Sequence, residues 1–240
     1  EGNISWGYNP NFFLAPDKYY GPKNAYKAFI DECHSRGIAV IMDIALNHSF
    51  GLNPQVQLYF DPNAGQWGQP TAESPWFNEI PKHDFNVGYD FNHESVHTQW
   101  LVDLVTKFWI DEYKIDGYRF DLSKGFTQTP SGSNVDLWGQ YDASRVKIWK
   151  RIYDKIRSYD ASAYVILEHF AANNEENELG NYGMLFWGNS KSDMTRVVQG
   201  YTQDLSQASY KMRGFTNPSV VNYIESHDEE RLMVEMTAGA

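Results

Sequence analysis

The stretch IDGYRFDLSKG, residues 115–125, is an apolar, strand-like run that ends in a carboxylate, Asp121. Two further runs end in the same way: AYVILEHF (163–170) reaches Glu168, and VVNYIESHDEER (220–231) reaches Asp228. An acidic residue at a strand end can simply cap the following helix, and capping would explain any one of the three. Three together favour an active site, because a parallel β/α barrel builds its site from the loops at the carboxyl ends of its strands.

Helices and apolar strands alternate along the chain. Apolar side chains recur at helical spacing in residues 22–36, 95–113 and 143–159, and a polar helical stretch covers about 191–211. Strands are predicted in the runs IAVIMDIAL (38–46), KIDGYRFDL (114–122), AYVILEHF (163–170), GMLFWG (183–188) and SVVNYIES (219–226). A sixth strand is expected before residue 6. Such alternation predicts parallel strands joined by helical crossovers.

Residues 49–94 interrupt this alternation. They are rich in Pro, Gly, Asn and aromatic residues and follow the strand 38–46 at its carboxyl end. A loop of this length inside a compact domain is usually functional, so we expect it to overhang the active-site face. The chain therefore divides into a catalytic β/α barrel, residues 1–48 and 95–240, and an inserted loop domain, residues 49–94.

The composition favours a neutral ligand such as a carbohydrate. The chain has 31 acidic and 20 basic residues, and its formal charge of -11 argues against nucleic acid or an anionic membrane as a partner. Aromatic residues make up 16% of the chain, and Trp and Tyr rings stack on the flat faces of sugars. Cys33 is the only cysteine, which excludes a disulfide framework and a cysteine-based metal site. No apolar run approaches the roughly 20 residues that span a bilayer.

Four segments match the ordered sequence regions of one enzyme family. They are DIALNH (43–48), GYRFDLSKG (117–125), EHF (168–170) and ESHDEE (225–230), and WGYNPNFFLAPDKYYG (6–21) precedes them. Along nearly its whole length the chain resembles the α-amylase family, glycoside hydrolase family 13. The resemblance implies retaining enzymes on α-glucosidic bonds with a (β/α)8 TIM barrel and a short irregular insert after strand 3. Roughly strands 2 to 7 would be present, in a chain that we expect to be part of a longer protein.

Asp121 and Glu168 form the candidate catalytic pair. Arg119 stands two residues before Asp121 on the same side of a strand, and a guanidinium favours the ionised carboxylate that a nucleophile needs. Glu168 ends an apolar run, and partial burial near Asp121 and Asp228 should raise its pKa, which suits a general acid. Retention of configuration predicts the two carboxyl groups about 5–5.5 Å apart, whereas about 8 Å would favour inversion.

The resemblance also implies residues that hold the sugar. Asp228 matches an aspartate that grips sugar hydroxyls and helps to distort the ring, and it completes the predicted catalytic set. Tyr8 matches an aromatic platform at the cleavage point. The other predicted substrate-binding residues are Asp43, which would support Arg119 from the neighbouring strand, and Arg119, His48, Lys124 and His227. One departure is Lys124-Gly125, where amylases acting on starch often carry Lys-His, so one sugar contact is missing.

A structural calcium site is implied by the same resemblance. In many relatives an asparagine that matches Asn47 binds Ca²⁺ with a carboxylate from the insert and a backbone carbonyl after the nucleophile strand. Calcium takes six to eight oxygen ligands, and the insert offers Asp84 and, in the better matching position, Asp90. Asp90 could equally cap the following helix, and many branching and debranching relatives lack the ion, so both interpretations stay open. No organic cofactor is expected.

The predicted function is retaining hydrolysis of α-1,4-glucosidic bonds in starch or a related α-glucan. The alternative is a branching or debranching enzyme of the same family, because no motif decides whether water or a sugar hydroxyl attacks the intermediate. A non-catalytic glucan-binding relative is a further alternative, against which the full set of three carboxylates argues. A metal-dependent barrel enzyme is disfavoured, because the spacing of His48, His83 and His93 matches no compact metal motif.

Overall fold

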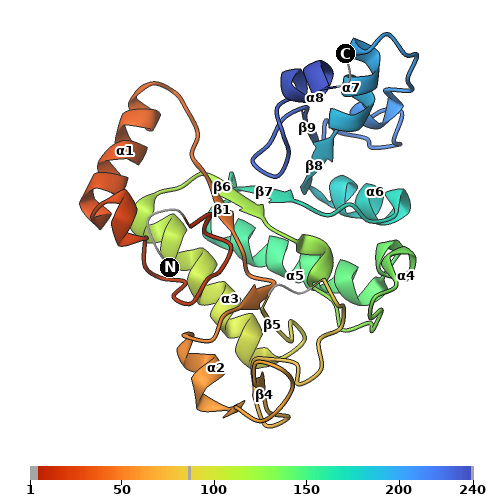
Figure 1. The fold of residues 1–240 in the computed structure, drawn as a ribbon. Helices are drawn as coiled ribbons and strands as arrows, with labels where there is room; N and C mark the ends of the chain where they lie inside the picture. Colours follow the sequence, from red (N-terminus) through yellow and green to blue (C-terminus); the bar gives the residue numbers. More distant parts are fainter. Residues whose placement is uncertain (1–4, 86–87, 239–240) are drawn as a thin grey trace.

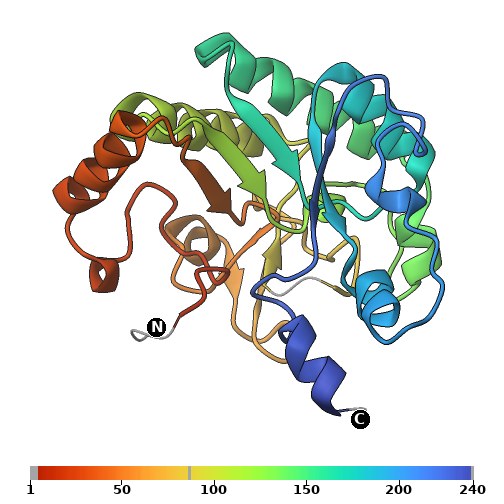
Figure 2. The same cartoon turned by 90° about the horizontal axis from the view of Figure 1, so that it is seen from above.

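The centre of the molecule is a five-stranded parallel sheet. The computed structural model describes residues 5–85 and 88–238. Its main strands are β1 (Ile41–Ile44), β6 (Gly117–Phe120), β7 (Tyr164–Leu167), β8 (Leu185–Asn189) and β9 (Val220–Tyr223). They pair as parallel neighbours in chain order and form the inner arc in Figure 2. Each of them lies in one of the five runs predicted as strands.

Helices alternate with these strands, and α1, α3, α5 and α6 lie outside the arc (Figure 1 and Figure 2). The long helices are α1 (Lys23–Ser35), α3 (Val96–Phe108), α5 (Ala143–Tyr159), α6 (Asn173–Tyr182), α7 (Lys191–Val198) and α8 (Leu232–Ala238). A π-helical turn, η2 (Trp109–Tyr113), continues α3, so the two together fill the predicted helix 95–113. This alternation confirms the predicted α/β class and the β/α barrel arrangement of strands.

The central strands of the sheet, β6 and β7, form from short apolar runs that are buried on both faces, as parallel strands between helices require. All four residues of β6 are buried, and in β7 only Tyr164 is exposed. A glycine, Gly117, begins β6 because a Cβ at this position would lie 2.3 Å from the carbonyl oxygen of Tyr164. The close approach fixes the register of β6 against β7, which places Arg119 opposite Ile166. The strand ends that carry the predicted site are therefore set by packing.

Residues 49–94 hold several short elements that lie at the far end of the molecule from α7 and α8 (Figure 1). They comprise α2 (Pro54–Leu58), β3 (Phe60–Asp61), β4 (Gln69–Pro70) and β5 (Tyr89–Asp90), and β5 pairs antiparallel with β2 (His48–Ser49). The segment also reaches the loop after β6, because Asp84 N donates to Gly132 O at 3.1 Å and Ser131 N to Lys82 O at 2.8 Å. That the segment is a separate inserted domain stays a prediction.

Some predicted elements differ from the structure. The helix predicted over 191–211 ends at Val198, because Gly200 takes a left-handed φ of 91° that stops helices. The rest of that range is irregular apart from η4 (Ser206–Ala208). The helix α6 was not predicted, nor were the short elements of residues 48–94. Other elements that were not predicted are η1 (Lys18–Tyr20), η3 (Ser123–Gly125) and α4 (Val135–Gly139). The sixth strand, expected before residue 6, falls on positions outside the described residues.

Among the described residues, no helix combines the length and the apolarity that a bilayer crossing needs.

Candidate active site

Arg119 is the centre of the predicted site. It lies on β6, is almost fully buried, and stands opposite Asp43 of β1 in the sheet register. Its Nη1 donates to Asp43 Oδ1 at 2.8 Å and to Asp121 Oδ1 at 2.9 Å. Asp43 therefore contacts Arg119 from the neighbouring strand. The guanidinium holds Oδ1 of Asp121, so Oδ2 of Asp121 is the candidate attacking atom.

The same guanidinium also contacts Glu168, which follows β7. Arg119 Nη2 lies 2.8 Å from Glu168 Oε1, a charge contact between the neighbouring strand ends. The other oxygen, Oε2, accepts a hydrogen bond of 2.8 Å from the backbone N–H of Leu122. Leu122 directs this N–H from a left-handed backbone conformation, with φ of 46°, which is rare for a residue with a side chain. Both oxygens of Glu168 are thus held, and the two predicted catalytic carboxyl groups share one cation.

Burial decides the protonation of both carboxyl groups. It raises the pKa of Glu168 to about 7, against the opposing effects of Arg119 and the Leu122 N–H, and Asp121 and Asp228 add to the rise. Glu168 can therefore carry a proton near neutral pH, as predicted. Burial also raises the pKa of Asp121, although Arg119 acts in the opposite direction. Arg119 thus favours the ionised form of Asp121, as expected, but its effect is smaller than that of burial.

Asp228, His227 and Tyr8 form a more open side of the site. Asp228 and His227 are exposed after β9, with His227 Nε2 3.4 Å from Asp228 Oδ1. The ring of His227 stacks on Tyr8, with ring centres 5.2 Å apart and an interplanar angle of 20°. Tyr8 donates its hydroxyl to Asp43 Oδ2 at 2.7 Å. Burial and the bond to Asp43 raise the pKa of Tyr8, so the hydroxyl stays a donor.

His48 and Lys124 are occupied by protein groups. His48 is fully buried, and burial lowers its pKa. Its Nε2 lies 2.9 Å from the backbone oxygen of Tyr8, so its contact with the site is to the Tyr8 backbone. Lys124 donates from Nζ to Phe170 O at 3.1 Å and lies 4.3 Å from the ring centre of Trp138. A direct sugar contact by either residue stays a prediction.

Two aromatic residues near the site were missed by the sequence analysis. The Trp187 ring on β8 lies 5.6 Å from the Arg119 guanidinium carbon, and Tyr223 at the end of β9 lies 5.0 Å from Trp187 between ring centres. Burial raises the pKa of Tyr223 to about 12, with Glu229, Glu168 and Asp228 adding to the rise. The sequence offered one sign that these two residues belong to the site. Both stand near the carboxyl ends of predicted strands, and those ends meet at one face of a β/α barrel.

Asn47 and Asp90, the predicted calcium ligands, each carry a buried side-chain oxygen, Oδ1, without a hydrogen-bond partner. They are brought near each other because His48 pairs with Asp90 in the β2–β5 ladder. Burial raises the pKa of Asp90 to about 7, which a cation would reverse. Oxygen donors of this kind suit calcium. Within residues 5–85 and 88–238, however, no group of three or more His, Cys, Asp or Glu side chains is arranged to hold a metal.

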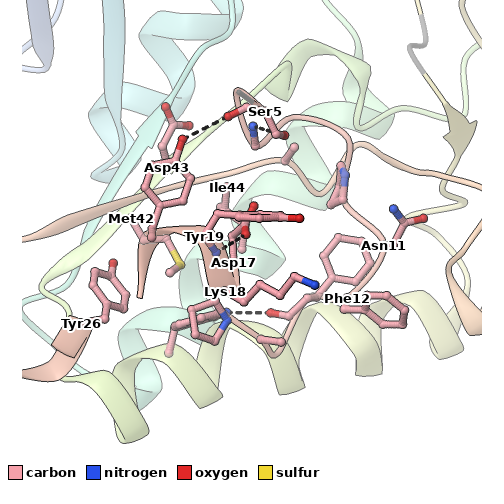
Figure 3. A pocket seen from close by; sticks show the side chains of 18 of the residues that line it. Ser5, Asn11, Phe12, Asp17, Lys18, Tyr19, Tyr26, Met42, Asp43 and Ile44 are labelled. Carbon is pink, nitrogen blue, oxygen red and sulfur yellow. Dashed lines mark hydrogen bonds between the residues drawn. The ribbon is translucent and has the colours of Figure 1, made fainter. Parts of the chain in front are cut away.

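A cavity of about 800 Å³ lies beside the site, between residues 5–21, α1 and β1 (Figure 3). Asp43 and Ile44 of β1 border it, with Tyr19 and Tyr26 (Figure 3). The three predicted catalytic carboxylates do not line this cavity. We therefore place the candidate site at the strand ends, where charged groups converge on Arg119, and not in the larger cavity.

Comparison with known proteins relates the chain to two glucan enzymes and to an amylase fold. No family model matches it. In sequence it is similar to 1,4-alpha-glucan branching enzyme GlgB of Shewanella frigidimarina, with 30% identity over 134 residues, covering 56% of this chain and 17% of that protein. It is also similar to the chloroplastic isoamylase SU1 of Zea mays, with 32% identity over 138 residues, covering 51% of this chain and 16% of the isoamylase.

In structure the chain is similar to an Anoxybacillus alpha-amylase. The TM-score is 0.70 at 19% identity, and the match covers 97% of this chain and 49% of the amylase chain. At this identity the likeness concerns the fold. The matches to the two sequence relatives cover less than a fifth of the length of either protein.

Proposed function

We propose that this chain is a member of the α-amylase family and cleaves α-1,4-glucosidic bonds of an α-glucan with retention of configuration. The observation that carries the proposal is the shared guanidinium of Arg119, which contacts Asp121 at 2.9 Å and Glu168 at 2.8 Å from neighbouring strand ends. Two carboxyl groups that face one glycosidic bond are the apparatus of glycoside cleavage. A pair held by one cation is pre-organised for that reaction.

The two carboxyl groups take different parts in the reaction. Asp121 attacks the anomeric carbon and forms a covalent bond to it, while the bond to the leaving oxygen breaks. Glu168 gives its proton to that oxygen and becomes a carboxylate. In the second half it takes a proton from the incoming hydroxyl, which displaces Asp121 and restores the original configuration. A pKa of about 7 for Glu168 suits both transfers near neutral pH.

The open side of the site would hold the sugar. Tyr8 and His227 present stacked rings, and Asp228 offers an exposed carboxylate beside them. Aromatic rings suit the apolar faces of glucose units, and a carboxylate accepts hydrogen bonds from two hydroxyls. Residues 49–94 would overhang this side as an inserted loop domain. Asn47 and Asp90 would hold a structural Ca²⁺ between the end of β1 and this segment.

Water is the acceptor in the first candidate function, α-1,4 hydrolysis. A sugar hydroxyl is the acceptor in the second candidate function, branching. The similarity of the chain to a branching enzyme supports this second candidate. Incubation with amylose separates them. Hydrolysis releases reducing ends and makes no new linkage, whereas branching makes α-1,6 linkages that proton NMR detects without a matching rise in reducing ends. A debranching enzyme would instead release linear chains from amylopectin. The absence of all three products, in a folded chain that binds maltooligosaccharides, would reject catalysis and leave glucan binding.

A further inference from the structure

A buried chain of polar side chains runs from α5 to the loop that carries Glu168. It consists of Arg145 on α5, Glu175 on α6, His169 and Ser123, all of which are at most 1% exposed. Arg145 donates from Nε to Glu175 Oε1 at 2.5 Å and from Nη2 to Oε2 at 2.8 Å. His169 Nε2 lies 2.7 Å from Glu175 Oε1, and its Nδ1 lies 2.9 Å from Ser123 Oγ.

The chain ends on the backbone of the proposed general acid. Ser123 donates from Oγ to Glu168 O at 2.7 Å, and its backbone N–H donates to the same oxygen at 3.0 Å. The hydroxyl of Ser123 therefore lies between two partners, the carbonyl oxygen of Glu168 and Nδ1 of His169. The residue before Ser123 is Leu122, whose N–H holds the Glu168 carboxyl at 2.8 Å. Ser123 thus ties both ends of Glu168, directly at the backbone and through Leu122 at the carboxyl.

The arrangement of Ser123, His169 and Glu175 has the connectivity of a nucleophilic triad but cannot act as one. A nucleophile must meet its substrate, and the Ser123 side chain is fully buried between Glu168 and His169. Burial alone would raise the pKa of Glu175, but the hydrogen bonds from His169 and Arg145 lower it below the ordinary value. Glu175 is therefore a fixed anion inside the protein, which anchors the position of the His169 ring.

We infer that Ser123, His169 and Glu175 are positioning residues for Glu168: they lock the Leu122–Ser123 turn against the Glu168 peptide and so fix where the proposed acid points. The inference rests on the proposed function for its catalytic meaning. The left-handed backbone at Leu122, which an unsupported loop would not keep, is the structural consequence of the lock. Proton transfer requires the carboxyl within hydrogen-bond reach of the glycosidic oxygen, so small displacements matter.

Substrates that differ only in leaving group provide the test. Maltooligosaccharides need a proton on the departing sugar oxygen, whereas an α-maltosyl fluoride loses fluoride without one. Glu175→Gln replaces one carboxylate oxygen by an amide N–H₂ group. That group cannot accept the hydrogen bond that Arg145 or His169 donates, so the chain of hydrogen bonds is disrupted. We expect kcat on maltooligosaccharides to fall on the order of 10²-fold and kcat on the fluoride to change by less than about threefold. An equal loss on both substrates would overturn the inference, because it would report general damage.

A second variant and a matched control keep the test valid even where Glu175→Gln does not fold. Ser123→Ala removes one hydroxyl and leaves the ion pair of Glu175 with Arg145 intact, so we expect it to fold and to show the same leaving-group dependence. Asp103→Asn is the control, because Asp103 pairs with another α5 arginine, Arg151, at 2.6 Å and touches none of the active-site loops. The control should leave both rates unchanged. Full rates on both substrates in Ser123→Ala would also overturn the inference.

A carboxyl titration by ¹³C NMR reports the lock without any turnover. The groups that set the charge around Glu168 are Arg119, Asp121, Lys124, Tyr223, Asp228 and the Leu122 N–H. Loss of the Leu122 hydrogen bond removes a contact that lowers the pKa of Glu168, so in Ser123→Ala this pKa should rise by about one pH unit. Glu168→Gln identifies the resonance. If wild-type protein cleaves neither substrate, the proposed function fails, and an unmoved titration would separately reject the positioning role.

Discussion

The candidate site has two sides that differ in how firmly they are held. On one side, the side chains of Asp121 and Glu168 are 16% and 14% exposed and share the guanidinium of Arg119. On the other side, the side chain of Asp228 is 49% exposed, and His227 Nε2 lies 3.4 Å from its Oδ1. The groups proposed to make and break bonds are rigid and dry, whereas those proposed to hold the sugar are open.

This difference follows from the strands on which the two sides stand. β1 pairs with β6 over four residues, and β6 pairs with β7 over four residues. β6 is buried along its whole length. β7 and β8 pair over two residues only. β8 and β9 pair over four, but no residue of β9 is fully buried. A reacting pair benefits from fixed geometry, whereas a glucan must enter and leave past the open side. The predictions below test whether rigidity and chemistry coincide.

The largest effect is expected for Asp121→Asn, which removes the proposed nucleophile and keeps its shape. Activity on maltooligosaccharides should fall by at least about 10³-fold. Stability should change the other way: burial raises the pKa of Asp121 above its ordinary value, so ionisation of this carboxyl costs folding free energy, and the neutral amide should raise the Tm. Asp228→Asn is the comparison, because its exposed carboxylate should affect activity with little change in Tm. Equal Tm shifts in both variants would contradict the contrast between the two sides.

The next effect concerns Glu168 and pH. Because Glu168 must be protonated to act as an acid and its pKa lies at about 7, kcat/KM should fall tenfold per pH unit above pH 7. On the acid side kcat/KM should fall where Asp121, whose pKa burial raises, becomes protonated and can no longer attack. Glu168→Gln should lose about 10²- to 10⁴-fold on maltooligosaccharides and keep no basic limb in its pH profile. A profile in which the variant retains the wild-type limb would assign that limb to another group.

The rigid side was also the more predictable one from the sequence. Arg119 and Asp121 stand two apart on an apolar strand, so their shared direction follows from strand geometry, and Asp43 follows from the neighbouring strand. The hydrogen bond from Leu122 to Glu168 could not be predicted, because it depends on a left-handed φ at a non-glycine residue. Glu175 was missed because α6 is polar and shows no apolar period, so its carboxylate looked like a surface charge.

Substitutions of Tyr8 test how the open side of the site holds the substrate. Tyr8→Ala removes the ring that stacks on His227, and we expect KM for maltooligosaccharides to rise about tenfold with a smaller change in kcat. Tyr8→Phe keeps the ring and loses only the hydroxyl that donates to Asp43, so it should stay within a few-fold of wild type in KM. Steady-state kinetics of the two variants separates stacking from hydrogen bonding. A larger KM effect in Tyr8→Phe than in Tyr8→Ala would show that the hydroxyl, and not the ring, is what the substrate senses.

The smallest expected effect is that of calcium, and it concerns stability alone. Asn47 and Asp90 carry buried oxygens without partners, and they join the end of β1 to residues 49–94. Saturating Ca²⁺ should therefore raise the Tm by about 5 °C, since a ligand at 100 times its Kd stabilises by about 2.7 kcal/mol. The gain should shrink below pH 7, where Asp90, with a pKa of about 7, holds a proton that competes with the ion.

Asp90→Asn is the matched variant for the calcium prediction. It keeps the hydrogen-bonding shape of the side chain and removes the charge that would attract the ion. Thermal unfolding with Ca²⁺ and with a chelator should then give the same Tm in the variant and different values in the wild-type protein. Identical values in the wild-type protein would mean that the two oxygens are satisfied without a cation. The junction between β1 and residues 49–94 would then be held by the β2–β5 ladder and its hydrogen bonds, including the bond from Asn78 to Asp90 at 2.7 Å.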